Sequence, residues 1–144
     1  MTGEINYPLF MVCIDSEQHE SAAISYACQH ALASGGRIGL FQTMELDEFQ
    51  NWATVEDKMK QELREAGEKE LWHIAGYIKE TYNLIPEFYI EEGTPLEALI
   101  RLSVQENLFE IIVSCEKSDL PDYMDVKKVR KLLAPIVFTP EKTI

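Results

Sequence analysis

LFMVCI, residues 9–14, is a continuous apolar run that ends at Asp15 and Ser16. Six apolar residues without polar alternation are typical of a strand that is buried on both faces of a sheet. The polar pair after the run indicates a turn, and either residue can cap a helix that begins there. We therefore expect a central strand at residues 9–14, followed by a helix.

The rest of the chain repeats this alternation of apolar runs with segments of helical spacing. Further apolar runs predict strands at residues 37–43, 84–90, 108–113 and 135–139. Helical spacing predicts helices after Ser16, from Thr54, from Thr94 and over residues 122–133. Such alternation predicts one α/β domain over residues 1–144, a doubly wound five-stranded parallel sheet with helices on both faces.

Local signals place several boundaries of these elements. Gly35 and Gly36 end the first helix. Thr94 and Pro95 supply a cap and a first-turn proline for the third helix. Pro86 lacks a backbone N–H, so the strand predicted at residues 84–90 belongs at an edge of the sheet.

Composition restricts the classes of partner. The formal net charge of -12 argues against nucleic acid or an anionic membrane surface as a main partner. There is no run of about 18 apolar residues, and the first residues lack a basic segment followed by an apolar stretch, so we expect a cytoplasmic protein. The three cysteines form no CxxC pair, which indicates reduced thiols rather than disulfides or zinc.

Four segments, in order, resemble the universal stress protein family over essentially the whole chain. They are FMVCIDSE at residues 10–17, EEGTPLEALI at 91–100, LFEIIVS at 108–114 and APIVF at 134–138. In family members that bind ATP, the Asp after the first strand and the residue that ends the second strand lie near the adenine and ribose. The resemblance implies these positions for Asp15 and Thr43, and it places Ser114 in the same crevice.

The segment after the fourth strand departs from the family pattern. Members that bind ATP hold the triphosphate there with a GxxG loop followed by another Gly and a Ser or Thr. Residues 114–133 read SCEKSDLPDYMDVKKVRKLL, and no glycine follows Gly93. Close backbone approach to phosphates needs glycine, and the acids at 116, 119, 122 and 125 would repel an anion. We therefore expect no dependence on ATP and no cofactor. Lys127 to Lys131 are expected on the solvated face of the helix at 122–133.

Other constellations indicate no specific chemistry. Asp15 has neither the acidic neighbour nor the later lysine of a response-regulator site, and a cap remains its alternative role. No histidine has metal-ligand spacing and no GxSxG motif occurs, so we expect no enzyme. Cys13 and Cys115 lie at the ends of neighbouring strands in the family fold. The two alternatives for these thiols are a redox-sensitive pair and inert buried side chains. Phe49 and Trp52 are candidates for a protein contact.

Three functional hypotheses follow. The first is a regulatory or protective stress-response binding protein that does not depend on ATP, dimeric through the last strand at Pro135 to Thr139. The second is an ATP- or AMP-binding switch that uses Asp15 and Thr43 with an unusual phosphate site. The third is a binding module for another small molecule in the crevice of Asp15, Thr43, Ser114 and Cys115.

Overall fold

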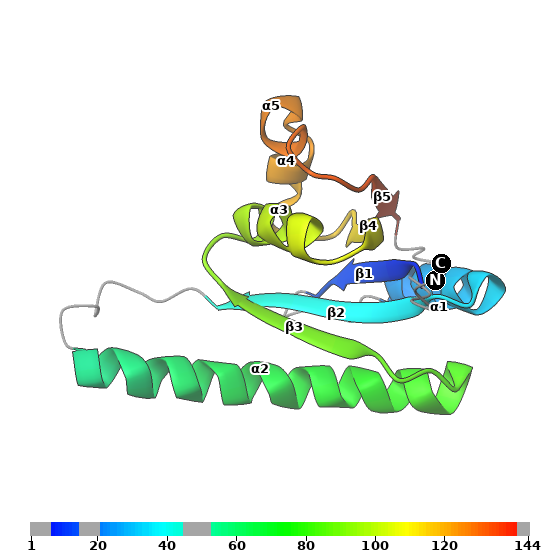
Figure 1. Cartoon of the computed structure of the whole chain (residues 1–144). Helices are drawn as coiled ribbons and strands as arrows, with labels where there is room; N and C mark the ends of the chain where they lie inside the picture. Colours follow the sequence, from blue (N-terminus) through cyan, green and yellow to red (C-terminus); the bar gives the residue numbers. More distant parts are fainter. Residues whose placement is uncertain (1–6, 15–20, 45–52, 141–144) are drawn as a thin grey trace, which may run out of the picture.

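The computed structural model describes residues 7–14, 21–44 and 53–140. Its helices and strands alternate along the chain (Figure 1). In chain order they are β1 (Leu9–Cys13), α1 (Ser21–Ser34), β2 (Arg37–Met44), α2 (Ala53–Tyr82), β3 (Glu87–Glu92), α3 (Pro95–Gln105), β4 (Leu108–Ser114), α4 (Leu120–Tyr123), α5 (Val126–Val129) and β5 (Ile136–Thr139).

The strands form one parallel sheet in the order β3-β2-β1-β4-β5. In Figure 1 the long helix α2 runs beneath the sheet and α3 lies on the opposite side. This arrangement confirms the predicted doubly wound parallel sheet with helices on both faces. Among the helices of the described residues, none is long and apolar enough to cross a membrane.

Strand β1 lies at the centre of the sheet and contributes to both halves of the core. Phe10 and Val12 pack with residues of α1 and α2, whereas Leu9, Met11 and Cys13 pack with residues of α3. Successive side chains of a strand point to opposite faces, so an apolar run without alternation is what this position requires.

The helix boundaries follow from the local signals. Gly35 adopts a left-handed φ of +70°, and the N–H of Gly36 donates to the carbonyl of Ala31, which closes α1. Helix α3 begins at Pro95 as predicted, although the side chain of Thr94 makes no capping hydrogen bond. Instead the carbonyl of Thr94 accepts from the N–H of Ala98.

Two predicted elements differ in the structure. The third strand begins at Glu87 rather than at residue 84, because Pro86 has no N–H for the ladder; β3 is nevertheless an edge strand, as predicted.

The prediction of a single helix over residues 122–133 is wrong. Two short helices replace it, because Asp125 adopts an extended conformation and its carboxylate accepts from the N–H of Lys127, starting a new helix. Lys127, Lys128 and Lys131 are exposed there.

The buried centre of β1 generates a stability prediction with a matched control. Val12 is 0% exposed, whereas Val104 on α3 is 70% exposed. Val12→Ala should lower the free energy of unfolding by about 2 kcal/mol, because it removes buried methyl groups and leaves a cavity. Val104→Ala should change it by less than about 0.5 kcal/mol. Urea denaturation measures both, and equal effects would contradict the placement of β1.

Candidate functional site at the carboxyl ends of the strands

The strand order places a topological switch point between β1 and β4. The chain moves from β1 to β2 and β3 on one side, and then returns to β4 and β5 on the other side. Ligands of such sheets bind beyond the carboxyl ends of the strands at this point. Cys13, Thr43 and Ser114 lie at or near these strand ends.

The structure does not bring the predicted crevice residues together on one face of the sheet. Asp15 lies outside the described residues, as do Phe49 and Trp52. Thr43 is partly buried and follows Phe41, which packs on the α3 side of the sheet, by two residues. Ser114 is fully buried and follows Ile112, which packs on the α1 side, by two residues. Strand alternation therefore puts Thr43 and Ser114 on opposite faces, with β1 between their strands.

Ser114 starts the turn that follows β4. Its hydroxyl oxygen accepts a hydrogen bond of 3.1 Å from the N–H of Glu116, and its carbonyl accepts one of 3.2 Å from the N–H of Lys117. The N–H of Leu120 then donates to the carbonyl of Lys117 at 3.2 Å. These turns lead directly into α4, so backbone N–H groups at 117 and 120 are used within the segment.

Helix α4 buries a tyrosine at the end of the sheet. Tyr123 is only 2% exposed and belongs to the same core cluster as Cys13. Burial raises the pKa of Tyr123 far above its ordinary value, and the neighbouring Cys13 and Asp119 raise it further. A large apolar ring therefore occupies the segment in which the family pattern has a glycine-rich loop.

Three buried polar atoms near this end of the sheet lack hydrogen-bond partners in the described residues. Within the described residues, Asp119 Oδ1, the Tyr123 hydroxyl and Thr139 Oγ1 are buried and make no hydrogen bond. Lys117 is 9% exposed, and its Nζ lies 3.8 Å from Asp119 Oδ1, an ion pair longer than a hydrogen bond. Asp122 is paired with Lys128 at 2.9 Å. Thr139 follows Val137, which packs on the α1 side, by two residues, so its hydroxyl lies on the face opposite Tyr123. Buried polar atoms usually have partners, so the atoms of Asp119 and Tyr123 can accept a polar ligand.

The sequence indicated the acids of this segment but not its core residue. Tyr123 is the one aromatic residue in 114–133, and that isolation within a charged stretch is the signal that could have revealed it. Lys117 carried no signal of burial, because it lies among exposed charges. The structural role of Thr139 depends on β5 pairing with β4, which places Thr139 opposite Ser114.

The two cysteines at the strand ends lie in different environments. β1 pairs with β4, as the resemblance implied. Cys13 is buried, whereas Cys115 is exposed and its N–H donates to the carbonyl of Thr139 at 2.9 Å. Within residues 7–14, 21–44 and 53–140, no group of three or more His, Cys, Asp or Glu residues could hold a metal ion.

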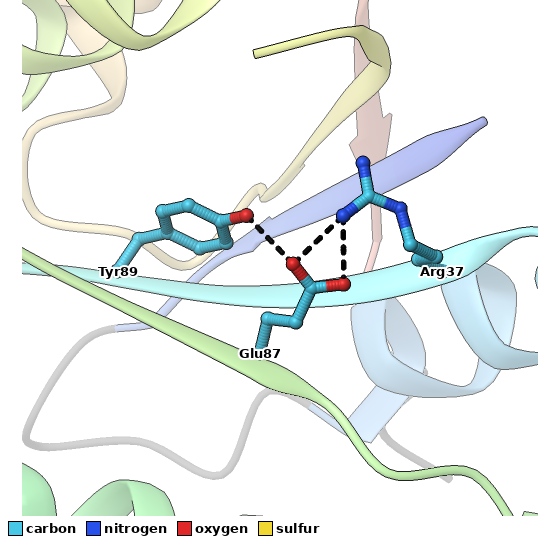
Figure 2. Close-up of polar contacts among 3 residues, drawn as sticks. All are labelled: Arg37, Glu87 and Tyr89. Atoms are coloured by element: carbon cyan, nitrogen blue, oxygen red, sulfur yellow. Dashed lines mark hydrogen bonds and ion pairs between the residues drawn. The ribbon is translucent and has the colours of Figure 1, made fainter. Parts of the chain in front are cut away.

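A second polar cluster lies at the opposite ends of the strands (Figure 2). Arg37, the first residue of β2, contacts both carboxylate oxygens of Glu87, the first residue of β3, at 2.8 and 2.9 Å. The Tyr89 hydroxyl donates to Glu87 Oε1 at 2.9 Å. Burial raises the pKa of Tyr89, and its hydrogen bond to Glu87 raises it further. One guanidinium nitrogen, Arg37 Nη1, makes both contacts, and this charge-assisted pair joins the edge strand to its neighbour.

The comparisons with known proteins concern the fold. No protein-family model matches the sequence, and no curated protein matches it. Solved structures match in fold. The universal stress protein UspA from Lactobacillus plantarum has a TM-score of 0.73 at 12% identity, over 94% of this chain and 99% of that one.

Two further similar structures contain nucleotides. The universal stress protein from Archaeoglobus fulgidus in complex with dAMP has a TM-score of 0.61 at 12% identity, over 94% of this chain and 99% of that one. A universal stress protein family protein from Arabidopsis thaliana with AMP bound has a TM-score of 0.62 at 11% identity, over 94% of this chain and 93% of that one. The chain therefore has the universal stress protein fold, as its sequence motifs predicted.

The buried hydroxyl of Tyr123 generates a prediction about stability and pH. A Tyr123→Phe variant should be as stable as the wild type at pH 7 or more stable, because a buried hydroxyl without a partner is unfavourable. In the unfolded chain a tyrosine loses its proton near pH 10, whereas folded Tyr123 keeps it to higher pH. The folded state then binds more protons, so wild-type stability falls as the pH rises above 10, by up to about 1.4 kcal/mol per pH unit.

Urea denaturation between pH 7 and 11 measures this effect. Tyr123→Phe should show a shallower fall in stability than the wild type above pH 10. Tyr77→Phe is the matched control, because the Tyr77 ring is exposed. A loss of stability at pH 7 would show that the hydroxyl has a partner, and an unchanged alkaline slope in Tyr123→Phe would show that burial does not raise the pKa of Tyr123.

Proposed function

We propose that this chain is a cytoplasmic stress-response protein that acts by binding, in a regulatory or protective role, and does not depend on ATP. The observation that carries the proposal is the segment after β4. It has no glycine, it contains a short helix that buries Tyr123, and its first turns use backbone N–H groups internally. A phosphate cradle needs several such groups free and at close approach.

The charges of the segment support the same proposal. Glu116 is exposed, Asp119 lies in the following turn and Asp122 lies in α4. The cations that lie nearest to these acids are already engaged, Lys117 with Asp119 and Lys128 with Asp122. To pair with these lysines, a triphosphate would have to displace the carboxylates. The carboxylates would then lie close to the phosphates without counter-ions and repel them. The proposal includes no chemical reaction.

One observation favours an adenine mononucleotide as an alternative ligand. Buried polar atoms of Asp119 and Tyr123 lack hydrogen-bond partners in the described residues, and two proteins of the same fold are bound to AMP or dAMP. A monophosphate carries less charge than ATP and needs a smaller cradle. The alternative is therefore a nucleotide switch that uses Asp15 and Thr43 and places its single phosphate near Lys117.

A thermal-shift experiment separates the two functions. A ligand that binds the native state raises the melting temperature by mass action, by an amount equivalent to about 2.7 kcal/mol at a hundredfold excess over Kd. Millimolar Mg·ATP should leave the melting temperature unchanged, and AMP should as well. A rise with AMP that Lys117→Gln abolishes would overturn the proposal in favour of the nucleotide switch. Lys131→Gln, at an exposed lysine, is the matched control.

We further propose that the protein is a homodimer through its last strand. β5 is an edge strand, and Phe138 on it is partly exposed. An exposed apolar edge can pair with its own copy about a twofold axis. The apolar segment at 135–139 therefore supplies both the backbone groups and the side chains of such an interface.

Light scattering after size exclusion tests the dimer. The wild type should have the mass of two chains, and Phe138→Asp should have the mass of one, because the new carboxylate would be buried without a partner. Val104→Asp introduces the same charge at an exposed position of α3, and this variant should remain dimeric. A monomeric wild type, or a dimeric Phe138→Asp variant, would contradict the proposed interface.

A further inference from the structure

An apolar groove lies between the second half of α2 and the chain that leads into β3. It has a volume of about 540 Å³, and its lining includes Trp72, Gly76, Ile85, Pro86 and Phe88. Trp72 is 66% exposed and Ile85 is 80% exposed, and the Trp72 and Phe88 rings meet edge to face with centroids 5.1 Å apart. Its size is typical of sites for small organic molecules.

Gly76 keeps this groove open. It lies in the interior of a 30-residue helix, where glycine is about 1 kcal/mol less favourable than alanine. Packing does not require it, since a Cβ at this position would meet nothing within 4 Å. Gly67 on the same helix differs, because a Cβ there would approach Gln42 Oε1 at 2.7 Å. The missing side chain at 76 therefore adds space to the groove rather than allowing a close contact.

The end of α2 places a cation beside the groove. Asn83 adopts a left-handed φ of 58°, which ends the helix, and Pro86 then leads the chain into β3. The side-chain oxygen of Asn83 accepts a hydrogen bond from Lys79 Nζ, and Lys79 lines the groove. Asn83, which ends α2, thus also holds the Lys79 ammonium group next to the apolar surface.

The dimensions and charges of the groove favour a small molecule over a second copy of the chain. Its helical wall runs from residue 72 to residue 79, which spans about 10 Å at 1.5 Å per residue. Exposed Lys69 and Glu80 lie beyond its two ends on α2. A stable interface between chains buries about 800 Å² on each partner, more than such a short apolar strip supplies. Lys79 is the charged residue among those that line the groove, and it complements an anion.

We propose that this groove binds a small apolar organic acid, with its apolar body over Gly76 against the Trp72 and Phe88 rings and its carboxylate paired with Lys79. The site lies at the amino-terminal end of β3, at the opposite end of the strands from the crevice beside Tyr123. It is thus independent of the question of nucleotide binding.

Site-resolved NMR titration of the ¹⁵N-labelled protein tests the proposal. The probes are 2-naphthoate and its neutral analogue 2-naphthylmethanol, and the reporters are the Gly76 amide and the Trp72 indole N–H. A Trp72→Phe variant distinguishes the indole signal of Trp72 from that of Trp52. Naphthoate should shift both reporters saturably and bind roughly threefold to fivefold more tightly than the alcohol, as expected for an exposed ion pair.

Two variants locate the binding. Gly76→Leu fills the groove and should abolish the shifts of the Trp72 indole; it replaces a helix glycine with a good helix former, so it should fold at least as well as the wild type. Lys79→Gln should remove the preference for the acid while the alcohol still binds. Lys131→Gln is the matched control at an exposed lysine and should change neither affinity.

Several results would overturn the proposal. One is the absence of saturable shifts at Gly76 and Trp72. Another is equal affinity for the acid and the alcohol in the wild type, or binding that Gly76→Leu leaves unchanged. Concentration-dependent shifts of the same reporters without any probe would show instead that a second copy of the chain covers the groove.

Discussion

The structure depends on burial of β1 on both faces. Its side chains alternate between a core formed with α1 and α2 and a core formed with α3, so both helical layers are attached to the same five residues. Parallel neighbours on each side satisfy its backbone groups. This constraint requires crossover helices on both faces of the sheet. It also brings the carboxyl ends of β1, β2 and β4 to one edge.

The segment after β4 begins at that edge. A glycine-rich loop leaves backbone N–H groups free for phosphate, whereas this chain uses the corresponding residues for turns and for packing Tyr123 beside Cys13. The ring contributes apolar burial to the core. Its hydroxyl and Asp119 Oδ1 remain without hydrogen-bond partners in the described residues. Burial of the Tyr123 ring therefore stabilises the core but leaves polar atoms beside it without hydrogen-bond partners.

The sequence predicted those features that local chemistry determines. Apolar runs identified the strands, and Pro95 and Gly35 fixed helix boundaries, because the backbone preferences of these residues act locally. The burial of Tyr123 and Lys117 could not be predicted, because it depends on how α4 folds back over β1. The break at Asp125 was missed since Val126, Val129 and Leu133 have helical spacing in either arrangement. The groove beside Gly76 depends likewise on the path of residues 83–88 past α2.

Calorimetric titration of the purified wild-type protein with Mg·ATP tests the central claim most directly, because the claim is that Tyr123 and its segment take the place of a phosphate site. The account predicts no binding heat up to millimolar ATP. Binding with a micromolar Kd, equivalent to about -8 kcal/mol, would contradict it. Such binding would require the segment after β4 to open and release Tyr123 from the core.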